Sequence, residues 1–580
     1  MARSQLQKLT AYMHPYWQKI ALGVLALLAV NALAVYIPLL IRDGVDELQI
    51  SFSFSQVVHY ALLIAGLTSL MWFIRMASRI LLFGVGRQVE FDLKQRLFQH
   101  LLTLEPSYFA STTIGDLINR ATSDVDNIRR LLGFAVLSLA NTVFAYSLVL
   151  PFMLAIHLKL SLLAIAVYPF MLILVQLFSA KLRTQQIAVQ ERLSTLSDLI
   201  QEDMSGISLI KIYAQEENER QAFRQFNQQL LAANLTLAQT RNLLFPVVEG
   251  LAYVSLVVLL GFGASAIANG SISIGDFVAL LLYVGQLVFP TALLGFTITA
   301  YQRGEVSIDR VEAILSVQPK IKDKPDAISL TDVQGKLTAR HLTYIYPEAD
   351  HAALQDVSFR IAASQTIAIV GPIGSGKSTL ANAIPRLLNI DPGQLFLDKY
   401  DITQLRLRDL RQAIAYVPQE SFLFGATIED NIRYGNPQSE RQEVEYAAKQ
   451  AQIHAEILNF PQQYNTVVGE RGITLSGGQR QRTALARALL VDAPILLLDD
   501  ALSSVDNQTA TQILKGLSEG TQRKTVVFIS HQLSAAATAD RILVMDEGKI
   551  VQSGTHAELM KQQGLYRQLW DQQKLEEMLQ

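Results

Sequence analysis

Residues 371–379 read Gly-Pro-Ile-Gly-Ser-Gly-Lys-Ser-Thr and fit the spacing G-x-x-x-x-G-K-[ST]. A β-branched apolar run, 365–370, precedes this segment and a helical pattern, 380–388, follows it. Between a strand and a helix, the glycines let backbone N–H groups close around phosphates at the helix N-terminus. The positive charge of Lys377 then serves the β- and γ-phosphates of a nucleotide, and the Ser378 hydroxyl serves Mg²⁺. The candidate nucleotide-binding residues of this loop are Gly371, Gly374, Ser375, Gly376, Lys377, Ser378 and Thr379.

A second candidate ligand for Mg²⁺, a carboxylate, follows a run of aliphatic residues. Residues 495–499 read Ile-Leu-Leu-Leu-Asp, which is typical of a buried parallel strand that ends in Asp499. A P-loop fold places its second magnesium-directed group at this position. Taken alone, an acidic residue after an apolar strand is often only the exit of the strand.

The segment 475–479, Leu-Ser-Gly-Gly-Gln, opens a helical pattern over 483–491. Two glycines at a helix start present free N–H groups and the positive end of the helix dipole, which suits a phosphate. Spacing alone is equally compatible with a Ser-Gly-Gly turn that merely starts a helix.

Six charge-free runs precede this region, at 20–41, 51–74, 131–158, 160–180, 250–275 and 277–302. Each is about as long as the ~20 residues that a helix needs to cross a hydrocarbon core of ~30 Å. With ends that extend past the runs, the predicted transmembrane helices are about 20–41, 51–80, 131–158, 160–180, 243–270 and 275–302. A buried core helix explains one such run, but not six together. The first run is too long for a signal peptide and no small-residue cleavage pattern follows it, so we expect it to be retained.

Lys and Arg gather on one side of these predicted helices. They are frequent in 87–130 and 181–241, whereas the opposite side has only Arg42 and Lys159. Because positive residues concentrate in cytoplasmic loops, both termini are predicted to lie in the cytoplasm. The two long inner segments carry helical periodicity, and we interpret them as membrane helices that continue into the cytosol and turn back near Phe109 and Tyr213. These turns are expected to dock on something soluble.

Composition divides the chain near position 320, after the last of the six charge-free runs. Charged side chains are clearly sparser before position 320 than after it, so an apolar part is joined to a part of ordinary soluble composition. We therefore predict a transmembrane domain over 1–320 and a soluble nucleotide-binding domain over 321–580. Net charge is −2 and cysteine is absent, which excludes a basic nucleic-acid-binding chain, a disulfide scaffold and a zinc-thiolate site.

The ordered motifs resemble those of the ATP-binding cassette (ABC) transporter family, specifically of exporter half-transporters. They are the P-loop, 417–420, 469–472, 475–479, 498–500, 503–506 and 529–531, and the resemblance covers nearly the whole chain. It implies an α-helical transmembrane domain of six helices with long cytoplasmic extensions, fused to an α/β P-loop NTPase domain with an ABC-type helical subdomain.

The resemblance also implies roles for residues in the soluble half, with ATP and Mg²⁺ as cofactors. Tyr346 would stack on adenine, although it also suits the core of a strand. Gln419 would join Ser378 and Asp499 around Mg²⁺, and His531 would contact the γ-phosphate. The residues implied at the dimer interface are Asp506 and the signature residues Leu475, Ser476, Gly477, Gly478 and Gln479.

The signature implies that one chain is not enough. In the family, two cassettes meet head to tail, so Ser476 and Gly478 would cap ATP that is held by the P-loop of the opposite subunit. The functional unit is therefore expected to be a dimer with two composite sites.

Asp500 departs from the family pattern, because active exporters usually carry Glu there to activate the attacking water. A carboxylate one methylene shorter falls short by about 1 Å, and such a misplacement can cost ~10²-fold in rate. This combination resembles the less active subunit of heterodimeric bacterial multidrug exporters. We expect a slow site here and a different partner chain with a catalytic Glu.

The predicted function is ATP-driven export of hydrophobic or amphipathic drugs, lipids or peptides across the cytoplasmic membrane, with no nucleic-acid partner. The alternative is a homodimeric lipid or peptide exporter with a slow Asp-based site, and a third is a non-transporting regulator or channel. Glu249 is an acidic residue directly before the membrane run 250–275 and is a candidate for the substrate path. It is equally compatible with a position in water below the bilayer.

Overall fold

The computed structural model describes residues 5–50, 53–347, 349–469, 472, 474–505, 507–519 and 524–579. The chain forms two compact units. One contains Met1–Leu102 and Thr112–Val317, and the other contains Thr103–Ser111 and Gln318–Gln580. We describe each by itself.

The first unit is helical, and within the described residues it has six helices that are long and apolar enough to cross a membrane. They are Gln7–Ile50, Phe54–Leu101, Ile114–Ile156, Leu158–Ser205, Glu216–Ala268 and Ile274–Leu315. Each is 42 to 53 residues long, which is much longer than the charge-free run that it overlaps. This confirms the predicted helical membrane fold with long helical extensions.

Several of these helices are composed of shorter elements. The first comprises α1 (Gln5–Met13), η1 (His14–Tyr16) and α2 (Trp17–Ile50), and the second is α3 (Phe54–Leu101). The third comprises α5 (Ile114–Asn119), η2 (Arg120–Asp124), α6 (Val125–Arg130), η3 (Leu131–Ala135) and α7 (Val136–Ile156). The fourth comprises α8 (Leu158–Ile165) and α9 (Val167–Ser205), the fifth is α11 (Glu216–Ala268) and the sixth is α12 (Ile274–Leu315). The short helix α10 (Ile207–Ile212) lies between the fourth and the fifth.

Helix α12 lies at the centre of this unit and contacts α2, α7, α9 and α11. Tyr283, Val284 and Leu287 are fully buried on it. Two of its glycines permit close approach of neighbours: a Cβ on Gly304 would lie 2.6 Å from the Leu131 side chain, and one on Gly295 would collide with Val175. Small residues at helix contacts are typical of membrane bundles, where close packing rather than water exclusion holds helices together.

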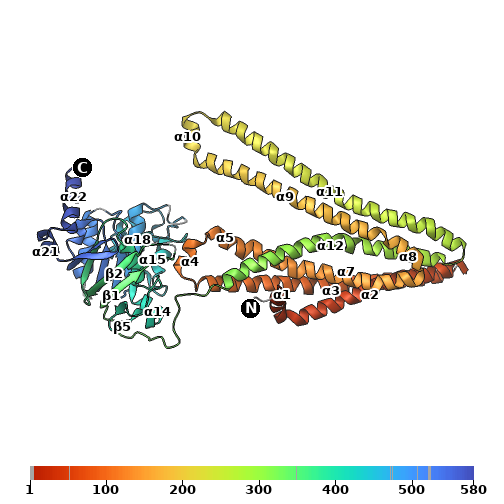
Figure 1. Cartoon of the computed structure of the whole chain (residues 1–580), viewed down its shortest axis with the longest axis horizontal. Coiled ribbons are helices and arrows are strands. Elements are labelled where there is room, and N and C mark those ends of the chain that lie inside the picture. The colour runs from red at the N-terminus through yellow and green to blue at the C-terminus, as the bar shows by residue number, and fades with distance from the viewer. Residues whose placement is uncertain are drawn as a thin grey trace. The chain divides into compact units, whose positions relative to one another are not determined.

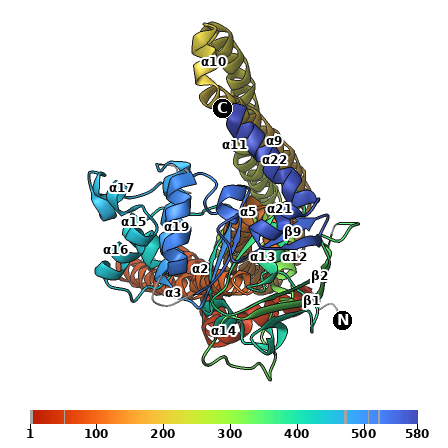
Figure 2. The same cartoon turned by 90° about the vertical axis from the view of Figure 1, so that its left-hand side faces the viewer.

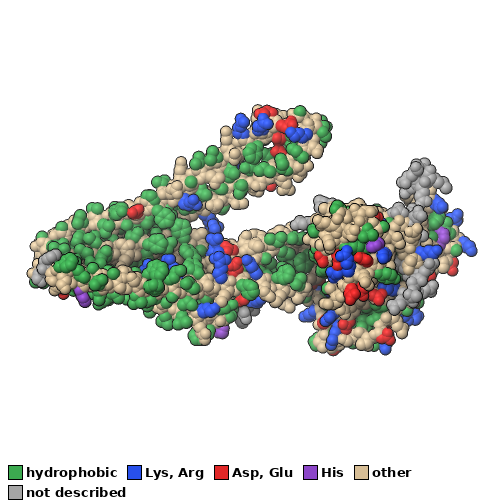
Figure 3. Space-filling view, turned by 180° about the vertical axis from the view of Figure 1, so that it is seen from behind, with side chains coloured by type: hydrophobic (Ala, Val, Ile, Leu, Met, Phe, Trp, Pro, Cys, Tyr) green, Lys and Arg blue, Asp and Glu red, His purple; other side chains and the backbone are tan. Residues whose placement is uncertain are grey.

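Helices α9 and α11 run side by side and project beyond the other helices of this unit, with α10 at their far end (Figure 1). Hydrophobic side chains cover much of the helical unit, whereas charged side chains gather at the far end of this hairpin (Figure 3). The charged residues there include the pairs Lys211–Glu216 and Arg220–Glu217. The predicted turn near Tyr213 is therefore the tip of a helical hairpin.

The second unit contains two sheets. A four-stranded antiparallel sheet has the order β2-β1-β4-β5, and a six-stranded sheet has the order β10-β9-β3-β8-β7-β6. In the larger sheet, β9, β3, β8, β7 and β6 are parallel and β10 pairs antiparallel with β9. The strands are β1 (Leu337–Tyr344), β2 (Leu354–Ile361), β3 (Thr366–Val370), β4 (Leu395–Leu397), β5 (Tyr400–Asp401), β6 (Ile414–Val417), β7 (Ile495–Asp499), β8 (Thr525–Ile529), β9 (Arg541–Asp546) and β10 (Lys549–Gly554).

Helices surround these sheets. A separate group, α15 (Ile428–Arg433), α16 (Arg441–Gln450) and α17 (His454–Leu458), lies to one side of β1 and β2 in Figure 2, and α15 and α16 contact α18 (Gly477–Leu490). The others are η4 (Ile402–Gln404), η5 (Gln463–Asn465), α13 (Lys377–Ala383), α14 (Leu407–Gln412), α19 (Asn507–Glu519), α20 (Leu533–Ala536), α21 (His556–Lys561) and α22 (Leu565–Leu579). The predicted α/β domain with a helical subdomain is confirmed.

The short helix α4 (Pro106–Ser111) belongs by its contacts to this second unit. Beside it, the Glu105 carboxylate accepts a hydrogen bond from the Lys320 backbone N–H at 3.3 Å. The turn near Phe109 thus groups with the soluble domain.

Candidate nucleotide-binding site

The predicted chemistry gathers at one edge of the large sheet. The P-loop follows β3, His531 follows β8, Asp499 ends β7 and Gln419 follows β6. Because these strands are parallel and adjacent in the order β3-β8-β7-β6, their carboxyl ends meet at the same edge. Strand order thus brings together motifs as distant along the chain as Gly371 and His531.

The P-loop depends on glycine at two points. Gly376 has φ +93° and caps α13, and a Cβ there would collide with the Ala353 carbonyl oxygen. A Cβ on Gly371 would likewise collide with the Met545 carbonyl oxygen. Only glycine lets the loop pass so close to these neighbouring carbonyl oxygens.

Lys377 is folded onto this loop and is 6% exposed. Its ammonium donates hydrogen bonds to the carbonyls of Gly371 at 3.0 Å and Pro372 at 2.7 Å, and to Ser375 Oγ at 3.3 Å. Burial lowers the pKa of Lys377, while Asp500 and Asp499 act to raise it. A phosphate is a stronger partner for an ammonium than these neutral acceptors.

Ser378 and Asp499 meet across the loop, with Ser378 Oγ donating to Asp499 Oδ1 at 3.1 Å. Asp499 is 3% exposed, and burial raises its pKa. A hydroxyl beside a buried carboxylate offers the oxygen ligands that Mg²⁺ prefers, and Mg²⁺ takes its other ligands from phosphates and water. These residues therefore fit a magnesium ion. The exposed Gln419 stands on the neighbouring strand end.

Sequence reasoning missed Tyr416, whose hydroxyl lies beside the Asp499 carboxylate. Its hydroxyl donates to Asn382 Oδ1 at 2.9 Å. Tyr416 lies on β6 opposite Leu497 of β7, so its place beside Asp499 follows from strand pairing. The only signal in the sequence was its position shortly before Gln419.

Asp500 has a left-handed backbone with φ +50°. Burial raises the pKa of its carboxyl group, whereas the His531 charge and hydrogen bonds from Ser503 and the His531 backbone lower it. The Asp500 carbonyl also accepts from Ser503 Oγ at 3.0 Å. The structure thus places Asp500 beside His531.

Tyr346 follows β1 and keeps 37% of its surface exposed. Its hydroxyl lies 3.3 Å from Thr379 Oγ1 on the first turn of α13, and its ring contacts Tyr344 edge to face. A partly exposed ring beside the P-loop helix favours a base-stacking position over the core of a strand.

The signature segment starts α18. Ser476 Oγ accepts from the Gln479 N–H at 3.2 Å, and Gln479 Oε1 accepts from the Ser476 N–H at 3.0 Å, which forms a capping box. Leu475 is buried, Ser476 is exposed, and Gly477 and Gly478 lie beside Ser504. The predicted interface residue Asp506 lies outside the described residues.

Glu249, the candidate for the substrate path, is exposed on α11. Its carboxylate accepts a hydrogen bond from the Tyr253 hydroxyl at 3.0 Å. This contact is between neighbours on one helix.

Comparison with known proteins supports both halves. The family model described as "ABC transporter transmembrane region" matches residues 20–291, and the one described as "ABC transporter" matches 354–503. The Bacillus subtilis "Probable multidrug resistance ABC transporter ATP-binding/permease protein YheI" is 33% identical over 99% of this chain and 98% of its own. The Syntrophus aciditrophicus "ATP-dependent lipid A-core flippase" is 30% identical over 97% of this chain and 93% of its own.

A solved structure has the same fold. It is described as "Structure of a bacterial Atm1-family ABC exporter with ATP bound", with a TM-score of 0.79, 26% identity, and coverage of 96% of this chain and 99% of that one. Membrane helices, cassette and relatives agree over almost the entire length. The chain therefore belongs to the ABC transporter family, as an exporter with fused transmembrane and ATP-binding domains.

Proposed function

We propose that this chain is one half of a heterodimeric exporter that uses ATP to move hydrophobic or amphipathic substrates out of the cytoplasm. The observation that carries the proposal is Asp500, which stands where an active site needs a longer carboxylate, next to an intact signature segment. That segment serves the ATP of the partner chain. One composite site would then be slow and the other fully active.

The P-loop residues hold the nucleotide in this proposal. Lys377 exchanges its loop carbonyls for phosphate oxygens, and Tyr346 stacks on the base. Ser378, Asp499 and Gln419 hold Mg²⁺, which neutralises charge on the phosphates when bound. Asp500 orients the attacking water and accepts its proton, while His531 donates to the γ-phosphate.

Closure of the dimer supplies the force for transport. ATP contacts both the P-loop of one chain and Ser476 and Gly478 of the other only when the cassettes meet, so ATP favours the closed state. We propose that α4 and α10 pass this closure to the membrane helices. Leu209, Ile212 and Tyr213 at the α10 tip are 60%, 72% and 68% exposed, as expected of a surface that a partner covers.

The charge distribution supports the orientation of this proposal. Both termini and the nucleotide-binding domain lie in the cytoplasm, because the Lys- and Arg-rich segments are on that side.

Native mass spectrometry of the complex from its own host tests the heterodimer. We expect a second polypeptide of similar size that carries Leu-Asp-Glu at the position equivalent to 498–500. Purified alone, this chain should hydrolyse ATP only slowly, and brisk turnover by a homodimer would contradict the proposal.

The second candidate function is a homodimeric lipid exporter with a slow Asp-based site. It is favoured by the similarity to a lipid A-core flippase and by the otherwise complete site around Asp500. A single polypeptide in the native complex, with steady ATP-dependent transport in vesicles, would select this candidate.

A further inference from the structure

A cavity of about 1110 Å³ lies among the helices of the membrane unit. It is lined from α3, from the segment 122–134, and from α9, α11 and α12. Its charged lining residues are Glu90, Lys94, Asp126, Arg129, Arg130, Arg183, Arg241 and Arg303. Six of these are cationic and two are anionic, so the cavity has a strong positive excess. We call it the arginine cavity.

The two carboxylates are already occupied by part of this cationic set. Glu90 pairs with Lys94 at 2.8 Å and with Arg129 at 3.3 Å. Asp126 pairs with Arg129 at 2.5 Å and Arg130 at 2.7 Å. Within the part of the chain that the structure describes, no ion pair forms at Arg183, Arg241 or Arg303.

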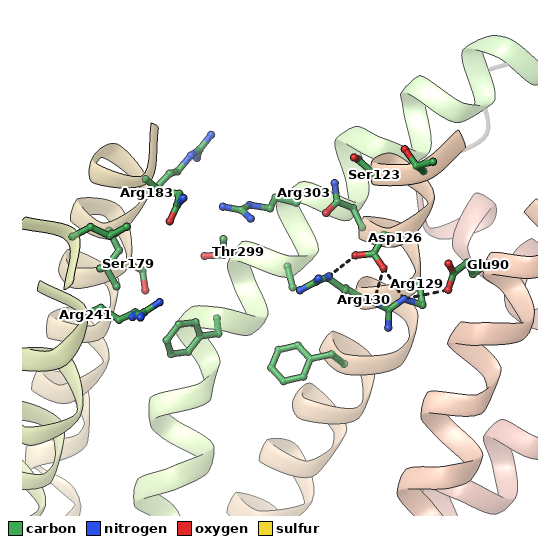
Figure 4. Close-up of a pocket in the computed structure, with 18 of the residues that line it drawn as sticks. Glu90, Ser123, Asp126, Arg129, Arg130, Ser179, Arg183, Arg241, Thr299 and Arg303 are labelled. Carbon is green, nitrogen blue, oxygen red and sulfur yellow. Dashed lines mark hydrogen bonds and ion pairs between the residues drawn. The ribbon is translucent and has the colours of Figure 1, made fainter. Parts of the chain in front are cut away.

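These three arginines come from three helices and converge on one space. Figure 4 shows Arg183 and Arg241 on one wall, from α9 and α11, and Arg303 reaching toward them from α12. Like charges without counter-charges repel one another, so an anion between them lowers the free energy of the arrangement. Guanidinium groups match phosphate and carboxylate oxygens in pairs, which makes such an anion the fitting occupant.

Ser179 adds a further polar group to this cavity. Its hydroxyl is buried and has no hydrogen-bond partner among the described residues, although it lines the same wall as Arg183. A buried hydroxyl without a partner is unfavourable, and a ligand that accepts its hydrogen bond removes that penalty.

A second cavity, of about 470 Å³, adjoins the arginine cavity, and Phe134 lines both. Its lining is mainly apolar and includes Leu27, Val30, Phe289 and Leu293, with Arg75 and Arg79 also present. Along α12, Phe289 lines the apolar cavity and Arg303 lines the arginine cavity, so the two features are about 21 Å apart at 1.5 Å per residue. A ligand that fits both has an anionic head and an apolar body.

We propose that the exported substrate is an amphiphile with a phosphate or carboxylate headgroup, which Arg183, Arg241 and Arg303 bind, and an apolar part that extends past Phe134 toward Phe289. The inference rests on the proposed export function and adds the substrate class. In this proposal the substrate path contains these three arginines. Glu249 takes no part in it, because this residue is absent from the lining of both cavities.

The test is equilibrium binding to the full-length transporter, with whatever partner chain co-purifies, in a neutral detergent without nucleotide. The probes are fluorescently labelled phosphatidic acid and phosphatidylcholine with identical acyl chains, followed by anisotropy. We expect phosphatidic acid to bind about tenfold more tightly. The double variant R183Q/R241Q, and separately R303Q, should lower the affinity for phosphatidic acid about tenfold or more. Neither variant should change the affinity for phosphatidylcholine.

The matched control is R192Q/R224Q, which removes the same charge from the same two helices outside the cavity. Arg192 donates to Gln229 at 3.0 Å and Arg224 is exposed, and neither lines the arginine cavity. The control should bind both probes as the unmodified protein does. Equal weakening by the control and the R183Q/R241Q variant would overturn the inference, as would equal affinity for the two probes.

Inorganic phosphate distinguishes the headgroup from a free anion. If an amphiphile is the ligand, millimolar phosphate should displace the labelled phosphatidic acid poorly. Complete displacement at that concentration would overturn the amphiphile assignment in favour of a small-anion site.

Lipid binding is measured without ATP and therefore does not depend on ATP-driven transport. If the unmodified protein showed no ATP-driven transport in a separate vesicle assay, that result would count against the proposed function and would leave the binding result intact. A protein that still transports but binds both probes equally would overturn the inference alone.

Discussion

Asp499 and Asp500 are consecutive carboxylates with different tasks. Asp499 ends β7 within reach of Ser378 and Tyr416, whereas Asp500 turns through a left-handed backbone toward His531. Burial raises the pKa of both, so the two neighbouring negative charges are unfavourable in this site until a cation offsets them. Substitutions of Asp499 and of Asp500 therefore test two different proposed tasks, which are metal binding and water activation.

Asp500→Glu should speed ATP hydrolysis, because the longer side chain restores about 1 Å of reach toward the attacking water. We expect a rise of up to ~10²-fold in turnover, measured by phosphate release. Asp500→Asn, which keeps the shorter length and removes the base, should show no rise. An Asp500→Glu variant no faster than the parent would mean that the short carboxylate is not the limiting feature. The left-handed backbone favours Asp over Glu, so the melting temperature should be compared as well.

Asp499→Asn should stabilise the protein at pH 7 in the absence of Mg²⁺ and nucleotide. The pKa of Asp499 is raised in the folded state by burial, so its ionised form destabilises folding above that pKa. This cost disappears as pH falls toward the unfolded value of about 3.9. The gain in melting temperature of Asp499→Asn should therefore shrink between neutral pH and about pH 4. A gain that does not change with pH would contradict the role of burial.

At the scale of elements, helix α18 packs against the segment that follows Asp500. Gln481 donates to Ser503 Oγ at 2.9 Å and accepts from the Ser504 N–H at 2.9 Å, so the signature helix is tied to the segment that follows Asp500. Gly478 lies so close to this segment that an added Cβ would be 2.7 Å from the Ser504 carbonyl oxygen. The packing of α18 therefore fixes the position of the signature segment, which in the proposed dimer would meet the ATP of the partner chain.

Gly478→Ala should push α18 away from Ser504 and disturb that surface. We expect a loss of at least about tenfold in ATP turnover of the assembled dimer, together with ~1–3 kcal/mol of destabilisation from overpacking. Gly516→Ala in α19 is the control, since a Cβ there meets nothing within 4 Å. It should be neutral or stabilising by ~0.5–1 kcal/mol. Equal turnover in the two variants would show that α18 tolerates displacement.

At the scale of the whole molecule, the hairpin of α9 and α11 ends in a tip where exposed apolar side chains lie among charged ones. Ile212 and Tyr213 are the most exposed of its large side chains. An exporter needs a contact that transmits cassette closure to the membrane helices, and exposed apolar side chains at the tip suit a partner surface.

The double change Ile212→Ser and Tyr213→Ser should uncouple the assembled exporter. ATP binding should remain, because these residues lie in the other unit from the P-loop. Transport of a fluorescent amphiphile into inverted vesicles should fall about tenfold or more. Ile187→Ser, exposed on α9 away from the tip, should leave transport unchanged. Parallel loss in both variants would point to a general effect of polar substitution.

The sequence by itself determined the six membrane helices, the P-loop and the family. A charge-free run marks a membrane helix because charges are costly to remove from water. Glycines at fixed spacing mark the P-loop because they give the backbone the freedom that the loop needs. Both effects are local, so both can be recognised without the fold. Strand order was not visible, and it alone brings Tyr416 to Asp499. Arg183, Arg241 and Arg303 appeared in the sequence only among the charges that flank the membrane runs. Their convergence on one cavity was decided by the tertiary structure, because residues far apart on three helices become one electrostatic site only after the helices pack.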